Sequence, residues 1–204
     1  VHPLPVEGEC SMSAMPNTPL TMTEAEYLAY EFESDIKHEY MSGEVWAMTG
    51  ASLRHNTIAV NLLTTLKNTL RGKNCNVYPS DMRVQVADTK DYMYPDVSVV
   101  CGDVQLAENV FDSLINPTVI IEVLSPSTER YDRGKKFQLY RRTPTLNTYL
   151  LIAQDSPRVE RYTKADDATW TLTDIIGLDA VVALLTLDCE LALNDIYDGM
   201  AFTS

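Results

Sequence analysis

The chain has 204 residues and a formal net charge of −13 at pH 7. That length fits one domain with a full hydrophobic core, and the sequence lacks the run of about 18 apolar residues that a membrane-spanning helix needs. The acidic balance argues against a protein that coats nucleic acid without specificity.

The first 20 residues differ in composition from the rest of the chain. They lack the basic start and apolar stretch of a secretory signal peptide, and they contain Pro3, Pro5, Pro16 and Pro19. We therefore expect residues 1–20 to form a mobile arm and residues 21–204 to form a single domain.

The cysteines are widely spaced and form no Cys-x-x-Cys motif, so the sequence supports neither a zinc site nor a disulfide framework. They are Cys10, Cys75, Cys101 and Cys189. A reducing compartment follows from this interpretation, and we expect the protein to be cytoplasmic.

Local patterns predict the first structural elements. Thr23 and Glu26 have the spacing of a capping box, which predicts a helix that continues to about residue 33. A β-hairpin is expected over residues 37–48, with its turn at Ser42 and Gly43. Apolar residues at helical spacing then predict a long core helix between Ser52 and Gly72.

Strands dominate the rest of the chain. Apolar or alternating runs predict strands at residues 76–78, 82–86, 94–100, 118–124 and 148–153. A basic helix over residues 132–142 should end before Pro144, and residues 158–163 and 169–173 should form an exposed hairpin. The last thirty residues contain two further apolar runs, 181–187 and 191–193. This order of elements predicts one mixed α/β domain.

The charge is unevenly distributed. Residues 130–142 contain six basic residues and one acid, Asp132, so this segment is +5 and the remainder of the chain is −18. A run of like charges usually forms a solvated helix face. Because this run follows the strand that contains Glu122, a functional role has about equal weight.

Two carboxylates lie in segments that should be buried strands. Glu122 is surrounded by aliphatic residues, and Asp96 precedes the apolar run at residues 97–100. A buried carboxylate is costly unless it is paired or coordinated. Two such carboxylates near a lysine could hold Mg²⁺ or Mn²⁺ for phosphodiester chemistry, provided that their strands are neighbours. Alternatively, Asp96 ends a turn and Glu122 forms a buried ion pair.

Lys135 and Lys136 compete for the role of the lysine at such a site. Adjacent helical residues point about 100° apart, so only one of them can face the site. Lys136 shares its helix face with Asp132 and Tyr140. Because Tyr140 should pack inward, we expect Lys136 to face the core and Lys135 to face solvent.

Several motifs together resemble the Uma-type family of restriction-endonuclease-like proteins in the PD-(D/E)xK nuclease superfamily. Between residues 22 and 197, in order, they are Lys37-His-Glu-Tyr, Gly43-Glu-Val, Arg54-His55, Tyr94-Pro-Asp-Val, Ile121-Glu-Val-Leu-Ser-Pro-Ser-Thr, Asp132-Arg-Gly-Lys-Lys and Tyr149-Leu-Leu-Ile. The segment that begins at Ile121 is the most specific of them.

The resemblance implies roles for particular residues. Asp96 and Glu122 would be metal ligands, and Glu39 would be a direct or outer ligand. Lys136 would be the catalytic lysine, displaced to the helix from the usual strand position, which is Leu124 here. His55, Tyr140 and Asp132 would surround these ligands. For His55, a purely structural role near the start of a helix has equal weight.

The resemblance also implies a restriction-endonuclease-like fold, with a central mixed sheet flanked by helices, and a homodimer that cleaves DNA, whether duplex or nicked. The first functional hypothesis is therefore a Mg²⁺- or Mn²⁺-dependent DNA endonuclease. The alternative is a non-catalytic nucleic-acid or protein-interaction module on a nuclease scaffold, because fold does not fix function and the sequence contains no DNA-recognition motif.

Overall fold

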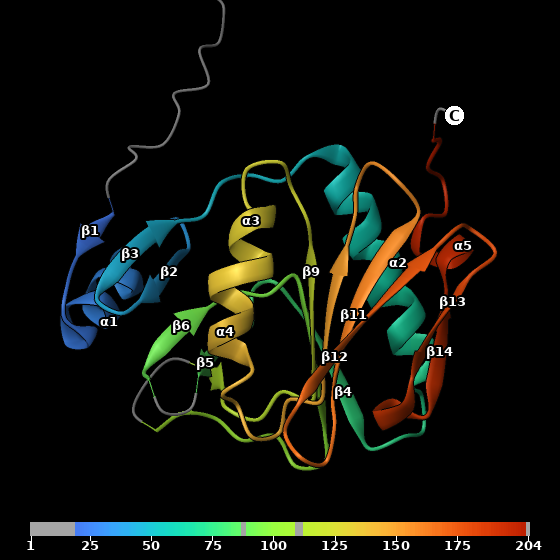
Figure 1. Ribbon diagram of the computed structural model, residues 1–204. Coiled ribbons are helices and arrows are strands. Elements are labelled where there is room, and N and C mark those ends of the chain that lie inside the picture. Colours follow the sequence, from blue (N-terminus) through green and yellow to red (C-terminus); the bar gives the residue numbers. More distant parts are fainter. Residues whose placement is uncertain (1–18, 87–88, 109–111, 203–204) are drawn as a thin grey trace, which may run out of the picture.

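Two six-stranded sheets form the framework of the protein in the computed structural model, which describes residues 19–86, 89–108 and 112–202 (Figure 1). The central sheet has the order β12-β11-β10-β9-β7-β4, and the second sheet has the order β1-β3-β2-β6-β5-β8. This is the mixed α/β fold that the sequence predicts.

The central sheet contains most of the predicted strands. Its β9–β10 pair is parallel and its other pairs are antiparallel. The strands are β4 (Cys75–Pro79), β7 (Val97–Cys101), β9 (Val119–Val123), β10 (Thr148–Ile152), β11 (Arg158–Lys164) and β12 (Trp170–Ile176). The predicted hairpin at residues 158–173 is therefore an extension of this sheet.

The second sheet combines the N-terminal hairpin with strands from later in the chain. Its strands are β1 (Leu20–Thr21), β2 (His38–Met41), β3 (Glu44–Ala47), β5 (Arg83–Val86), β6 (Asp91–Met93) and β8 (Ser113–Leu114). The prediction missed β6 and β8 as strands. It also began the strand at residue 94, whereas β7 begins at Val97 after the chain has crossed between the two sheets.

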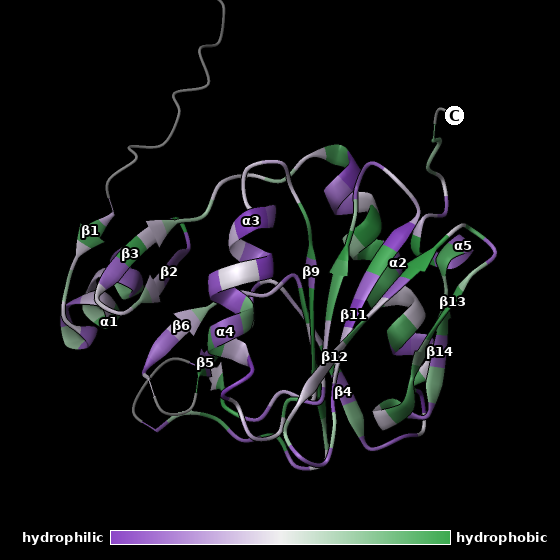
Figure 2. Ribbon diagram, viewed as in Figure 1, coloured by the Kyte–Doolittle hydropathy of each residue, from purple (hydrophilic) through white to green (hydrophobic). Residues whose placement is uncertain are grey.

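Helices cover both faces of the central sheet. Helix α2 (Leu53–Thr69) is capped by Ser52 and packs Ile58, Leu62 and Leu66 against one face. On the other face, α3 (Glu129–Tyr131), a π-helical turn (Asp132–Lys136) and α4 (Phe137–Tyr140) form one continuous helical segment. Figure 2 shows α3 as mainly hydrophilic, in contrast to the hydrophobic residues along the central strands.

The helix predicted over residues 132–142 therefore begins three residues earlier, at Glu129, and ends two residues earlier, at Tyr140. It also contains an irregular turn. Gly134 lies within that π turn, and the residues at its two ends, Asp132 and Lys136, are both buried. Single π turns inside α-helices often occur at functional sites.

The N-terminal part begins as the sequence predicts. Helix α1 (Glu24–Glu33) has the capping box between Thr23 and Glu26, and β2 and β3 form the hairpin around Ser42 and Gly43. Most of the arm predicted for residues 1–20 lies outside the described residues. Leu20 is described, and it pairs with Val45 in the sheet.

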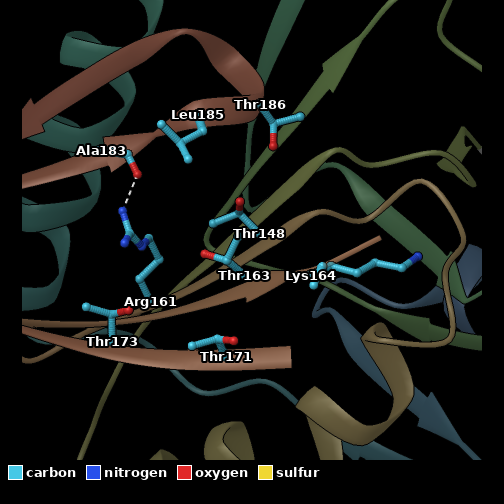
Figure 3. Close-up of a pocket in the computed structure, with 10 residues that line it drawn as sticks. Thr148, Arg161, Thr163, Lys164, Thr171, Thr173, Ala183, Leu185 and Thr186 are labelled. Atoms are coloured by element: carbon cyan, nitrogen blue, oxygen red, sulfur yellow. Dashed lines mark hydrogen bonds between the residues drawn. The ribbon is translucent and has the colours of Figure 1, made fainter. Parts of the chain in front are cut away.

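The two C-terminal apolar runs form a hairpin that packs beside α2. The elements are β13 (Val181–Leu184), a 3₁₀ turn (Leu185–Leu187), β14 (Cys189–Ala192) and α5 (Leu193–Ile196). A pocket of about 230 Å³ opens between this hairpin and the central sheet (Figure 3).

Cys75 and Cys101 form a disulfide, so the expectation of no disulfide was wrong. The register of β4 against β7 places these two residues directly opposite each other, although 26 positions separate them in the sequence. Their spacing in the sequence does not predict this pairing.

None of the helices in the described part of the chain is long and apolar enough to span a membrane.

Candidate active site

Neighbouring strands bring the two predicted carboxylates to the same place. In the antiparallel pair of β7 and β9, Val97 lies opposite Ile121. Asp96 directly precedes β7, and Glu122 follows Ile121 in β9. Asp96 Oδ2 also accepts a hydrogen bond from the Val123 amide at 2.7 Å. The two strands are therefore neighbours, which is one condition of the metal-site hypothesis.

Lys136 reaches Glu122 from the helical segment that covers this face. Its Nζ lies 3.0 Å from Glu122 Oε1 and 3.0 Å from Glu39 Oε1. Asp132 Oδ1, one turn earlier, lies 3.7 Å from the same nitrogen. Lys136 and Glu122 are only 5% and 3% exposed, whereas the neighbouring Lys135 is exposed and pairs with Glu44. Lys136 is thus the lysine that points inward.

Glu39 comes from β2 in the second sheet, and its position depends on a network that the sequence did not reveal. The Tyr94 amide donates to Glu39 Oε1 at 3.1 Å. The Tyr94 hydroxyl donates to Glu31 at 2.7 Å, and Glu31 also contacts the His38 amide and ring. Glu31 on α1 therefore fixes both segments that flank Glu39. Glu39, His38 and Tyr94 lie within motifs that the sequence singled out, whereas Glu31 does not.

Tyrosines complete the buried surroundings. Tyr140, one turn after Lys136, places its hydroxyl 3.4 Å from Glu122 Oε1. The Tyr149 hydroxyl donates to the backbone oxygen of Asp132 at 3.0 Å, which holds the π turn against β10. Of the predicted surrounding residues, Tyr140 and Asp132 thus both contact the group around Lys136.

Burial and crowding shift the proton affinity of these groups. Burial raises the pKa of Glu122 well above its usual value, and the nearby carboxylates raise it further, whereas Lys136 opposes the shift. Burial also raises the pKa of Asp132. For Lys136, burial opposes the charged form, but the carboxylates of Glu122 and Glu39 outweigh it, so the lysine pKa lies well above normal. The site therefore stabilises a charged lysine and disfavours several simultaneous carboxylate charges.

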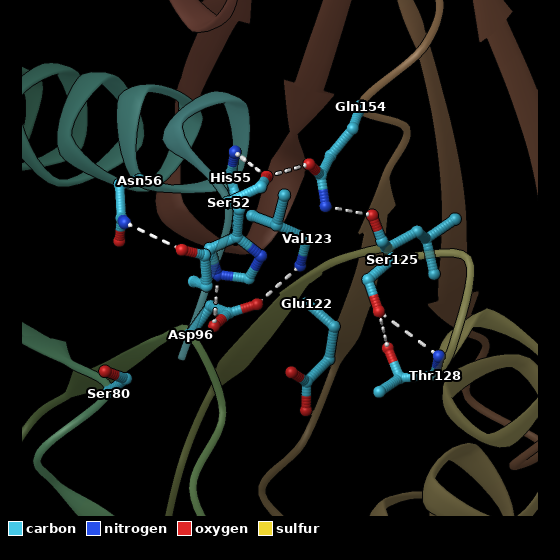
Figure 4. Close-up of polar contacts among 12 residues, drawn as sticks. Ser52, His55, Asn56, Ser80, Asp96, Glu122, Val123, Ser125, Thr128 and Gln154 are labelled. Carbon is cyan, nitrogen blue, oxygen red and sulfur yellow. Dashed lines mark hydrogen bonds and ion pairs between the residues drawn. The ribbon is translucent and has the colours of Figure 1, made fainter. Parts of the chain in front are cut away.

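Asp96 has a different immediate partner. His55, in the first turn of α2, places Nε2 2.9 Å from Asp96 Oδ1 (Figure 4). Because an ionised carboxylate only accepts hydrogen bonds, Nε2 carries the proton in this contact. Asp96 is thus held between the His55 ring and the Val123 amide.

The start of α2 is tied directly to the strand ends beside Asp96. Ser52 Oγ donates to Gln154 Oε1 at 2.7 Å, and Gln154 Nε2 donates to the Leu124 carbonyl at 2.6 Å (Figure 4). Arg54 Nε donates to the Gln154 carbonyl at 2.8 Å. These contacts fix the helix turn that contains His55. Sequence reasoning gave no role to Gln154, which lies about 100 residues from Ser52 and Arg54 and 30 residues from Leu124.

The basic segment is less basic in space than in sequence. Arg133 pairs with Glu129 and Glu160, Lys135 pairs with Glu44, and Lys136 is buried among carboxylates. The side chains of Arg130, Arg141 and Arg142 remain exposed. The segment thus contains one lysine that points inward, two basic residues that are paired with acidic residues, and three exposed arginines.

The predicted residues therefore fall into two adjoining sets. Lys136 contacts Glu39, Glu122 and Asp132, while Asp96 contacts His55. Across the described ranges, no three or more His, Cys, Asp or Glu side chains are arranged to hold a metal ion by themselves. An ion at this site would depend on one or two of these carboxylates and on ligands from outside the chain.

The fold is similar to that of a solved structure, a "putative nuclease belonging to DUF820" from Anabaena variabilis. The TM-score is 0.71 at 19% sequence identity, over 87% of this chain and 97% of that one. This similarity supports a nuclease-like fold.

Two proteins of Synechocystis sp. are more similar in sequence. Slr1290 is 40% identical over 87% of this chain and 92% of its own length, and sll1609 is 38% identical over 79% of this chain and 91% of its own length. Residues 24–194 match the Uma2 family, described as "Putative restriction endonuclease". The resemblance expected from the motifs is confirmed, and the chain belongs to the Uma2 family.

Proposed function

We propose that this protein is an endonuclease that hydrolyses DNA phosphodiester bonds with Mg²⁺ or Mn²⁺ as cofactor. Family membership supports nuclease activity in general. The observation that carries the specific proposal is the buried ammonium of Lys136, which lies 3.0 Å from both Glu39 and Glu122. Glu122 belongs to β9, which pairs with β7, the strand that Asp96 directly precedes.

The chemistry of these residues fits a hard divalent cation. Three carboxylates, from Glu39, Glu122 and Asp132, contact one ammonium, and a fourth, Asp96, directly precedes the neighbouring strand β7. If all ionise, the group has three excess negative charges, and burial together with the neighbouring carboxylates raises the pKa of Glu122. Mg²⁺ prefers oxygen ligands and is usually bound by one or two carboxylates together with waters and substrate phosphate.

Asp96 and Glu122 would hold the ion, with Glu39 as an outer ligand, and the ion would lower the pKa of a bound water and offset charge on the scissile phosphate. His55 and the Val123 amide orient Asp96. Lys136 would donate hydrogen bonds to a phosphate oxygen as negative charge develops there. Its contacts to Glu39 and Glu122 hold the ammonium in position before substrate binds.

Nicking of supercoiled plasmid DNA, with Mg²⁺, with Mn²⁺ or with EDTA, tests this function. We expect metal-dependent nicking by the native protein and a loss of it in Glu122→Gln, Asp96→Asn and Lys136→Met. Asp91→Asn is the matched control, because Asp91 is a buried carboxylate outside this group. Nicking that persists in EDTA, or that is unchanged in Glu122→Gln, would refute the proposed mechanism.

A second candidate function is a non-catalytic interaction module on the nuclease scaffold. It is favoured by the way Lys136 already pairs with Glu39 and Glu122, which partly satisfies the buried charges without an ion. Calorimetric titration with Mn²⁺ separates the two functions. Binding that is lost in Asp96→Asn supports the endonuclease, and an absence of binding supports the module.

We also propose that the active form is a homodimer. Two copies related by a two-fold axis would present one site to each strand of a duplex. Sedimentation velocity measures the state in solution, and a comparison of duplex, nicked and single-stranded substrates identifies the preferred DNA. A strictly monomeric protein that cuts both strands at one position would contradict this arrangement.

A further inference from the structure

The pocket beside the C-terminal hairpin lies away from the candidate active site. It opens between β10, β11 and β12 on one side and residues 183–186 on the other (Figure 3). Arg161 pairs with Leu150, which in turn pairs with Ile121. Since Ile121 and Glu122 are successive strand residues, Arg161 points to the face of the sheet opposite Glu122.

Threonine side chains form the floor of this pocket. Thr148 pairs with Thr163, and Thr163 pairs with Thr171, so three hydroxyl side chains lie side by side on three neighbouring strands. In the adjacent position, Arg161 pairs with Thr173. Such cross-strand neighbours have Cβ atoms about 4.5–5.5 Å apart, so their polar groups converge on one small volume.

The pocket contains threonine hydroxyls and a guanidinium but no acid. None of the ten residues that line it is Asp or Glu, although the chain as a whole has a net charge of −13. Lys164 contributes its stem, because its ammonium turns away and donates to the Pro144 carbonyl at 2.9 Å. Arg161 is therefore the cation that faces the pocket (Figure 3).

Arg161 has donor capacity that the protein leaves unused. One terminal nitrogen donates to the Ala183 carbonyl. Its Nε is buried, and no acceptor within the described part of the chain bonds to it. A buried N–H without an acceptor is unfavourable. The planar guanidinium suits the paired oxygens of an oxyanion.

We propose that this pocket binds a phosphate group, either as the free ion or at the end of a small phosphorylated molecule such as a mononucleotide. Arg161 neutralises the charge, and the hydroxyls of Thr163, Thr171 and Thr173 bond to the phosphate oxygens. The volume of about 230 Å³ is far above the roughly 10–15 Å³ that a single water molecule needs, so the pocket has room for a phosphate group. This site does not depend on the proposed nuclease activity.

Calorimetric titration of the native protein with inorganic phosphate, with sulfate and with deoxyadenosine 5′-monophosphate tests the proposal. We expect phosphate binding that becomes at least about tenfold weaker in Arg161→Met and in Thr163→Val, the loss expected when one charge-assisted hydrogen bond is removed. Tighter binding of the mononucleotide would identify a phosphorylated small molecule as the ligand, and equal binding would identify the free ion.

Arg158→Met is the matched control, because it removes the same charge from the same strand but on the opposite face, where Arg158 pairs with Asp174. It should bind phosphate as the native protein does, and so should Glu122→Gln. If Arg161→Met does not fold, Thr163→Val decides the result. An absence of phosphate binding by the native protein, or an equal loss in Arg158→Met, would overturn the proposal and leave the threonines with a role in sheet stability only.

Discussion

Replacement of Lys136 by methionine should destabilise the protein far more than replacement of Glu122 by glutamine. Lys136 contacts three buried carboxylates, from Glu39, Glu122 and Asp132, and its removal leaves all three without this counter-charge. Removal of one partner from a buried ion pair costs about 3–5 kcal/mol. Glu122→Gln instead leaves Lys136 with two carboxylates, removes one excess charge and keeps an acceptor oxygen, so we expect a change within about 1 kcal/mol.

The pH dependence provides an independent check. An acid whose pKa is raised by folding binds more protons in the folded state, so the free energy of unfolding increases as pH falls toward the unfolded glutamate value of about 4.3. Glu122 is such an acid, because its pKa is raised in the folded protein. Loss of Lys136 should also raise the pKa values of the neighbouring carboxylates. The penalty of Lys136→Met should therefore be smaller at pH 5.5 than at pH 7.5.

The titration of Lys136 itself should change the free energy of unfolding only at alkaline pH. Because its pKa is raised, its stabilisation is fully present below the unfolded lysine value of about 10.4 and is lost as pH rises through the folded value. Urea unfolding in EDTA at several pH values measures both effects. Equal losses in Lys136→Met and Glu122→Gln, or a Lys136→Met penalty that does not depend on pH, would refute this reasoning.

Three further predictions concern other parts of the molecule. Reduction of the disulfide between Cys75 and Cys101, which closes a loop of 26 residues, should lower the free energy of unfolding by about 3.5 kcal/mol by the chain-entropy relation. Urea unfolding with and without a reductant measures this loss. Leu62→Ala in α2 should cost about 2–5 kcal/mol in the same assay, because Leu62 is fully buried in the core; a loss below about 0.5 kcal/mol, typical of surface sites, would contradict this packing. His55→Ala should weaken Mn²⁺ binding by about 10- to 100-fold in calorimetry because Asp96 loses its orienting contact, and unchanged affinity would exclude that role.

The sequence by itself determined the features that depend on neighbouring residues. The capping box of α1 and the apolar spacing of α2 predicted both helices because helical hydrogen bonds and faces repeat within a few positions. Glu122 was recognisable because one carboxylate interrupts a short apolar strand. The order of Lys135 and Lys136 on a helix likewise predicted which of them points inward.

Only the tertiary structure decided how distant segments meet. The crossing between sheets after β6 positions Asp96, the β4–β7 register pairs Cys75 with Cys101, and Glu31 supports Glu39 from a separate helix. The row of threonines beside Arg161 likewise exists only because three strands align in one register. These contacts join residues whose separation in the chain carries no periodic signal, so strand pairing and packing alone bring them together.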